Sequence, residues 1–158
     1  MSPPQRIPRV QRLLARIINV YPPFLGAGVR VRQSKADPYT IVSSMKLRPW
    51  NRNLFGTHFG GSLYAMCDPF FAIIVARHLG AGYVVWSRSA FIDFLRPGRG
   101  TVRATFHVPP EEIDRIRERA DLGEKVEPRL TVEVVGEDRK VVARVDQKLY
   151  VRRARAEE

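Results

Sequence analysis

The sequence predicts an α+β fold in which a curled antiparallel sheet wraps around one long, central, apolar helix. The first observation is the stretch 60–80, which has apolar side chains on every face and includes Asp68, the one formal charge between Arg52 and Arg77. Such a helix needs cover on all sides, because a surface helix shows a polar side. The second observation is that segments of alternating polar and apolar residues, typical of half-buried strands, precede and follow this stretch. A sheet that surrounds the helix satisfies both observations.

Length and composition predict a single domain over residues 1–158, with 44% apolar and 27% charged side chains. The one cysteine, Cys67, excludes an intrachain disulfide and a cysteine metal cluster, and His78 and His107 form no metal set, so no metal is expected. Prolines interrupt the first eight residues, where a secretory signal needs an apolar run. The predicted location is therefore the cytoplasm.

The net charge of +11 is concentrated in residues 1–58, which hold ten Lys and Arg against one acid. Such a region attracts nucleic acid, an anionic membrane or a phosphorylated small molecule. A general preference for arginine, with 22 Arg against 5 Lys, explains the charge equally well. No nucleic-acid module is visible, and an Asp-Pro pair in the middle of the apolar stretch argues against a membrane span. We expect neither a nucleic-acid partner nor membrane insertion.

The first elements are a helix and two strands. Residues 1–8 are expected to fray, and residues 9–20 have apolar side chains at helical spacing, which predicts an amphipathic helix that ends at Tyr21-Pro22-Pro23. Residues 28–33 and 40–48 alternate between apolar and polar side chains on either side of an Asp-Pro turn, which predicts two strands. A loop then leads into the central helix over residues 60–80.

Four more strands and a surface helix follow. A long strand is predicted over residues 83–95, which ends at Arg96-Pro97-Gly98. A second strand is predicted over residues 100–108, where the apolar positions recur at every second residue. Residues 111–122 form a charged helix with a thin apolar stripe and acids in its first turn. Residues 129–135 and 140–152 flank a turn rich in Gly and Asp, which predicts a hairpin.

The segment before the central helix carries the motif Asn53-x-x-Gly56-x-x-Phe59-Gly60-Gly61, and Asp68 follows seven residues after the second glycine. This motif resembles the signature of hot-dog acyl-CoA thioesterases of the phenylacetyl-CoA type, usually Asn-x-x-Gly-x-x-His-Gly-Gly followed by an acid on the helix. Residues 90–100 resemble the second strand of that family and its Phe-Leu-Arg-Pro turn. The likeness spans roughly residues 51–150 and is greatest to the tetrameric acyl-CoA thioesterases.

The resemblance implies hydrolysis of an acyl-CoA thioester, with coenzyme A as part of the substrate and no other cofactor. The backbone N–H groups of Gly60 and Gly61 would hold the carbonyl oxygen as negative charge develops on it. Asp68 would act as general base on water or attack the carbonyl directly. The family completes its site across a dimer interface, so a homodimer or a dimer of dimers is implied.

Three candidate catalytic residues have alternative roles. Phe59 stands where the family has His, and His58, one place earlier, either points into the site or bonds to backbone. Asn53 orients a water molecule or closes a turn. Asp68 precedes Pro69, an order typical of a helix start, so the stretch is alternatively two short helices with Asp68 capping the second. Cys67 lies in apolar surroundings without a neighbouring cation and is not expected to be a nucleophile.

The predicted substrate contacts surround this segment. Arg96 and Arg99 match coenzyme A phosphates in chemistry, although they suit a solvated strand end equally. The remaining contacts are aromatic or polar side chains near the motif and the central helix: Phe59, Ser62, Phe71 and Trp86. Two other functions stay open: the same fold binding an acyl-CoA or fatty acyl group without cleaving it, and nucleic-acid binding through the basic first third.

Overall fold

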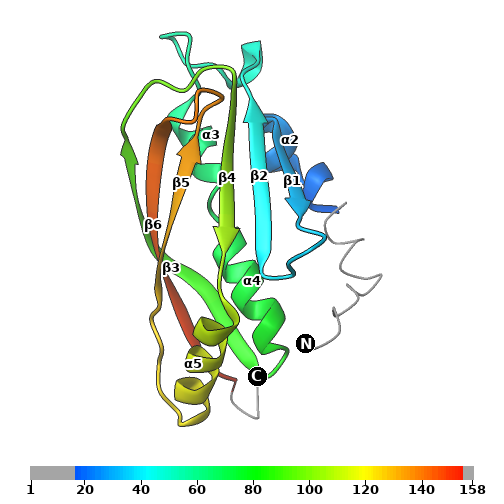
Figure 1. Ribbon diagram of the computed structural model, residues 1–158, viewed down its shortest axis with the longest axis vertical. Helices are drawn as coiled ribbons and strands as arrows, with labels where there is room; N and C mark the ends of the chain where they lie inside the picture. The colour runs from blue at the N-terminus through cyan, green and yellow to red at the C-terminus, as the bar shows by residue number, and fades with distance from the viewer. Residues whose placement is uncertain (1–16, 155–158) are drawn as a thin grey trace.

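The computed structural model describes residues 17–154, and one antiparallel sheet of six strands forms the framework of this part of the chain (Figure 1). The strands are β1 (Val29–Gln33), β2 (Thr40–Lys46), β3 (Tyr83–Phe94), β4 (Thr101–His107), β5 (Arg129–Val135) and β6 (Val141–Arg153). Their order in the sheet is β1-β2-β4-β5-β6-β3, so that the short β1 and the long β3 form the two edges. All six predicted strands are confirmed, with ends that differ by at most two residues.

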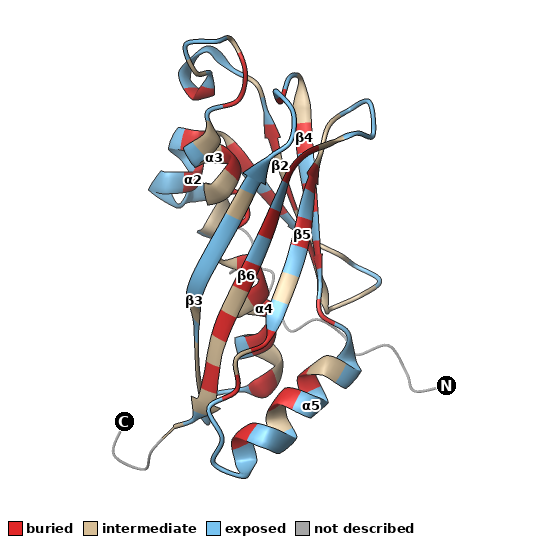
Figure 2. Cartoon of the chain, turned by 90° about the vertical axis from the view of Figure 1, so that its left-hand side faces the viewer, coloured by how far each residue is buried: buried red, intermediate tan, exposed pale blue. Residues whose placement is uncertain are grey.

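Helices fill the concave side of the sheet and cover one of its ends. They are η1 (Ile18–Val20), α2 (Pro22–Ala27), η2 (Pro49–Asn51), α3 (Gly60–Ala65), α4 (Phe70–Leu79) and α5 (Pro110–Asp121). The sheet curls around α4, which is the hot-dog arrangement expected from the sequence (Figures 1 and 2). At the centre of the core, Phe106 of β4 packs against Phe70 and Phe71 of α4, with ring centroids 4.9 and 5.2 Å apart.

The charged surface helix is confirmed as α5, which buries only its apolar stripe of Ile113, Ile116 and Ala120. The predicted amphipathic helix over residues 9–20 lies mostly outside the described residues, and its described end is the single turn η1. The sequence analysis missed α2. Pro22 and Pro23 end the preceding segment, as expected, but they also occupy the first turn of a new helix, where a missing N–H costs nothing.

The expected helix over residues 60–80 is present as α3 and α4, separated by a turn at residues 66–69. Pro69 has no N–H, so the carbonyl of Ala65 loses its helical partner and the regular pattern stops. No helical N–H within the described residues reaches the carbonyls of Met66, Cys67 and Asp68. The two-helix alternative therefore describes the backbone correctly.

Two buried polar side chains of the sheet supply the missing donors. The Ser43 hydroxyl in β2 donates to the Met66 carbonyl at 2.8 Å. The Gln147 amide in β6 donates to the carbonyls of Cys67 and Asp68 at 3.3 and 3.0 Å. Both side chains are fully buried on the inward face of their strands. Because a buried carbonyl without a partner is costly, these two residues make the helix break tolerable.

Across residues 17–154, no helix has both the length and the apolar character needed to cross a membrane.

Candidate functional site

The glycine pair begins α3, close to the edge strand β3. The backbone N–H groups of Gly60 and Gly61 donate to no acceptor in the described part of the chain, as expected for the first turn of a helix. A Cβ on Gly60 would lie 3.0 Å from the Phe94 ring, and one on Gly61 would lie 2.5 Å from the Phe59 ring. Glycine therefore lets two aromatic rings approach the backbone at this helix start.

Asp68 lies in the turn between α3 and α4 and is partly exposed. The hydroxyl of Tyr64, four residues earlier, donates to its carboxylate at 3.1 Å. Burial, followed by the negative charge of Asp68, raises the pKa of Tyr64 to about 12. Tyr64 thus keeps its proton and remains a hydrogen-bond donor at neutral pH. The residue in the N-cap position of α4 is Pro69, and no side chain caps that helix, so Asp68 does not take the capping role that the sequence left open.

The glycine pair and Asp68 belong to the same stretch but do not meet within one chain. Eight residues separate Gly60 from Asp68, which at 1.5 Å per residue places them roughly 12 Å apart along the helix. A general base and an oxyanion donor must each lie about 3 Å from the reacting group. One copy of the chain therefore does not assemble the predicted pair at a single thioester.

Asn53 closes the loop before the glycines. Its side-chain amide donates to the Thr57 hydroxyl at 2.9 Å, and its side-chain oxygen accepts from the N–H groups of Phe55 and Thr57 at 2.9 and 3.1 Å. Gly56, at φ 77°, takes the left-handed conformation that this turn requires. The geometry favours the turn-closing role of Asn53 over the water-orienting role.

His58 is fully buried and lies against the turn between β3 and β4. Its Nε2 lies 3.1 Å from the Gly100 carbonyl, and its Nδ1 has no partner within the described residues. Burial lowers the pKa of His58, against the opposing effect of the Gly100 carbonyl, so the ring is neutral near pH 7. These contacts favour a positioning role for His58 over direct proton transfer.

Arg96 and Arg99 line one hollow of about 300 Å³. The hollow lies between the β3–β4 turn and the β5–β6 hairpin, at the same end of the sheet as α3 (Figure 1). Lys140 adds a third cation to its wall, and Glu137 and Asp138 add two carboxylates. Because His58 holds the Gly100 carbonyl, this hollow is tied directly to the loop that carries the glycine pair.

Phe71 and Trp86, both predicted to contact the substrate, are not brought together. Trp86 pairs with Tyr150 and stacks on its ring at 4.2 Å, on the face of the sheet turned away from the helices. Phe91, opposite the outward-facing Asp146, lies on the same outer face. Phe71 instead packs in the core against Phe106. Phe71 and Trp86 therefore line no common pocket within one chain, because Trp86 lies on the outer face of the sheet.

Other predicted residues have simpler positions. Phe59 is 56% exposed with its ring over Gly61, and Ser62 is half-buried on α3. Cys67 is fully buried, and burial, followed by the charge of Asp68, raises its pKa to about 12, so this thiol is unsuited to nucleophilic attack. Among the described residues, no group of three His, Cys, Asp or Glu side chains is arranged to hold a metal ion.

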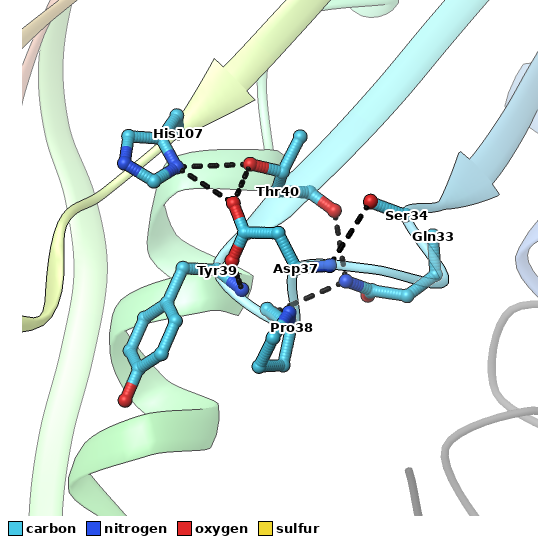
Figure 3. A network of polar contacts seen from close by, with 7 residues as sticks. All are labelled: Gln33, Ser34, Asp37, Pro38, Tyr39, Thr40 and His107. Carbon is cyan, nitrogen blue, oxygen red and sulfur yellow. Dashed lines mark hydrogen bonds and ion pairs between the residues drawn. The ribbon is translucent and has the colours of Figure 1, made fainter. Parts of the chain in front are cut away.

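A second polar cluster lies at the far end of β2, where Thr40 lies between Asp37 and His107 (Figure 3). The Thr40 hydroxyl donates to the Asp37 carboxylate at 2.5 Å and lies 2.9 Å from Nδ1 of His107. The Asp37 carboxylate also lies 3.1 Å from this same Nδ1. A catalytic triad needs the hydroxyl and the carboxylate on opposite nitrogens of the ring. The cluster therefore stabilises the β1–β2 turn and is not a nucleophile–base pair.

The curled sheet, the central helices and the glycine-led helix start define a hot-dog fold protein. PA5026 from Pseudomonas aeruginosa, described as a protein of unknown function and probable thioesterase, aligns with a TM-score of 0.78 and 20% identity over 96% of this chain and 99% of its own. Thioesterase HI1161 from Haemophilus influenzae aligns with a TM-score of 0.68 and 17% identity over 94% of each chain. PaaI of the E. coli phenylacetic acid degradation operon aligns with a TM-score of 0.64 and 21% identity, over 91% of this chain and 92% of its own.

The chain belongs to the family described as Domain of unknown function (DUF4442), whose model matches residues 10–151. No curated protein sequence matches the chain.

Two residues of the site were missed in the sequence analysis, although each left a signal. Gln147 interrupts the apolar alternation of β6, between Val145 and Leu149. Tyr64 lies four residues before Asp68, the spacing at which helical side chains meet.

Proposed function

We propose that this protein is an acyl-CoA thioesterase that works as a homodimer, or as a dimer of dimers, with each site shared between two copies. The observation that carries the proposal is the position of the glycine pair and Asp68 relative to the edge strand β3. The Phe94 ring of β3 packs on Gly60, and Gln147, paired with Ala90 of β3, holds the carbonyl of Asp68. Both halves of the site thus border the same sheet edge, roughly 12 Å apart in one chain.

The β3 edge has the properties of an interface between copies. Within the described residues β3 is long and pairs with β6 alone, and much of it is exposed (Figure 2). Phe91 and Phe94 are 62% and 56% exposed. An uncovered edge of this kind invites pairing with another strand, and a two-fold axis would place the same strand of a second copy against it. Such pairing would bring Asp68 of one copy toward the glycines of the other.

In the proposed reaction, the N–H groups of Gly60 and Gly61 donate hydrogen bonds to the thioester oxygen as negative charge develops on it. Asp68 takes a proton from water as the water oxygen attacks the carbonyl carbon, after which the C–S bond breaks and the leaving thiolate takes up that proton. Alternatively, Asp68 attacks the carbon itself and expels the thiolate, and water then hydrolyses the resulting mixed anhydride. Tyr64 holds the carboxylate through its hydroxyl. The Arg96 and Arg99 hollow offers guanidinium groups to coenzyme A phosphates. The products are coenzyme A thiol and a carboxylate, and the predicted location is the cytoplasm.

Thiol release from a panel of aliphatic and aromatic acyl-CoAs tests the chemistry. Wild type is expected to turn over at least one of them, and Asp68→Ala and Asp68→Asn are expected to lose at least about a hundredfold in kcat. Asp114→Asn, which removes an exposed acid from α5, is the matched control. Equal turnover by wild type and Asp68→Ala would exclude Asp68 as base, and no turnover of any substrate would exclude the enzyme.

Mixing two inactive variants tests the shared site. Gly60→Pro removes one N–H at a helix position where proline is tolerated, although its ring must displace Phe94. In a one-to-one mixture of Asp68→Ala and Gly60→Pro, allowed to exchange subunits to equilibrium, each heterodimer has one intact site, which combines Asp68 of one copy with Gly60 of the other. Random pairing in a two-fold dimer predicts recovery of about a quarter of wild-type activity. No recovery, with heterodimers demonstrated, would place each site within one chain.

A second candidate is an acyl-CoA binding protein without catalysis. Two observations favour it. The Phe59 ring lies over Gly61, at the position where the family signature has His, and His58 is buried. This candidate predicts that acyl-CoA raises the Tm of the protein while no thiol is released.

A further inference from the structure

An apolar groove of about 630 Å³ lies at the opposite sheet edge, between η1, strands β1 and β2, and α4. Its walls include Ile17, Val31, Ile41 and Ile73, and among the described residues its polar groups are Gln33, Arg77 and the hydroxyl of Tyr21, with no acid. Small-molecule sites have volumes of about 300–1,000 Å³ with mostly apolar walls and a few fixed polar groups, and the groove matches that description.

Arg77 is held in place at the groove. Its Nη1 donates to the side-chain oxygen of Gln33 at 2.6 Å. The Gln33 amide in turn donates to the carbonyls of Pro38 and Thr40 at 3.1 and 2.8 Å, as Figure 3 shows. All the polar atoms of the Gln33 side chain are therefore engaged, and they fix the guanidinium on the last turn of α4.

The charge of Arg77 has no counter-ion. No acid lies within ion-pair distance of it among residues 17–154, and Gln33 is its one hydrogen-bond partner there. Burial lowers the pKa of Arg77, because it removes water from around the cation. A guanidinium in this situation gains most from a carboxylate, which matches its remaining N–H donors in geometry.

We propose that this groove binds a medium- or long-chain carboxylate, with the acid on Arg77 and the alkyl chain along the apolar walls. The site lies at the β1 edge, away from the β3 edge that borders Asp68. It goes beyond the proposed thioesterase function and does not depend on it.

Calorimetric titration with decanoate tests the site. Wild type is expected to bind one decanoate per chain in a saturable manner. Arg77→Gln is expected to bind roughly ten- to hundredfold more weakly, the range for losing a hydrogen bond to a charged group. Ala76→Trp, which introduces an indole at an exposed position on the groove wall, is expected to abolish binding while the core stays intact. Arg115→Gln on α5 removes an equal charge elsewhere and is expected to bind like wild type.

Two further ligands identify the head group. Decan-1-ol is expected to bind far more weakly than decanoate, because it offers no negative charge. The proposal would be overturned if decanoate does not bind in a saturable manner. This outcome includes the case in which another part of the chain occupies the groove. Equal affinity of Arg77→Gln and wild type, equal affinity for decan-1-ol, or binding of decyl phosphate in place of decanoate would also overturn it. Because the readout is heat of binding, its outcome is separate from thiol release.

Discussion

Replacing Gln147 with leucine tests how the fold tolerates the helix break beside Asp68. The substitution leaves the buried carbonyls of Cys67 and Asp68 without a donor, at about 1–3 kcal/mol each. It also removes the Gln147 side-chain oxygen, which has no partner within the described residues, and this recovers about 1–3 kcal/mol. The net expectation is a loss of about 1–3 kcal/mol in the free energy of unfolding. For a chain of this size, that loss lowers Tm by roughly 2–12 °C.

Urea unfolding followed by circular dichroism measures this loss. Lys148→Leu, a change at the adjacent outward-facing position of β6, is the matched control and is expected to stay within about 0.5 kcal/mol of wild type. Pro69→Ala allows the helix to continue through residues 66–69, so that helical N–H groups can reach the carbonyls of Cys67 and Asp68. In that background Gln147→Leu is expected to cost at least about 1 kcal/mol less. If Gln147→Leu is as stable as wild type, or if the Pro69 background leaves its cost unchanged, then Gln147 does not support the break.

Three further predictions concern the loops and the titrating groups. Gly56→Ala is expected to lower the free energy of unfolding in urea by about 1–2 kcal/mol. Gly56 has φ 77° and a Cβ there would have no neighbour within 4 Å, so the cost comes from the backbone alone. A change below about 0.3 kcal/mol would contradict this. The pKa of His58 in the folded protein is below its ordinary value of 6.5, so the stability that His58 contributes is present above pH 6.5 and is lost as the pH falls below it. The Tm of His58→Asn is therefore expected to decrease less steeply below pH 6.5 than the Tm of wild type. Burial raises the pKa of Asp37, but the Thr40 hydroxyl, the Tyr39 N–H and His107 together lower it by more. The stability that Asp37 contributes is thus present above its unfolded pKa and lost as pH falls through the lower folded value, and the Tm difference between wild type and Asp37→Asn is expected to vanish in acid.

The strands and the surface helix could be predicted because their side chains alternate or recur with one regular period. Val102, Ala104 and Phe106 face inward in β4 as their spacing requires. The position of Trp86 could not be predicted in the same way. A bulge between Ser87 and Ser89 shifts the alternation of β3, so no single period describes that strand. The role of His58 depends on the Gly98–Gly100 turn, which is forty residues away in sequence, and no local pattern reports such a contact.

The break in the central helix was predictable only as an alternative, because Asp-Pro is compatible with a helix start and with an interrupted helix. What decides between them is the sheet. Ser43 and Gln147 occupy inward positions in strands that are otherwise apolar on that face, and a buried polar side chain needs a partner. Two such residues in different strands therefore indicate unsatisfied carbonyls between them, at the centre of the fold.

The helix break and the two polar residues that support it, Ser43 and Gln147, also bear on the position of Asp68. A continuous helix would need neither Ser43 nor Gln147, and apolar residues at both positions would be the more stable choice. Departures from regular structure that persist in this way are expected at functional sites. The break places Asp68 in a turn that Gln147 holds against β6, beside the β3 edge, instead of on a regular helical turn facing the core. If the proposed role of Asp68 is correct, the two buried polar residues serve to position its carboxylate at that edge. The Gln147→Leu variant is then expected to lose the proposed thioesterase activity in conditions where it remains folded.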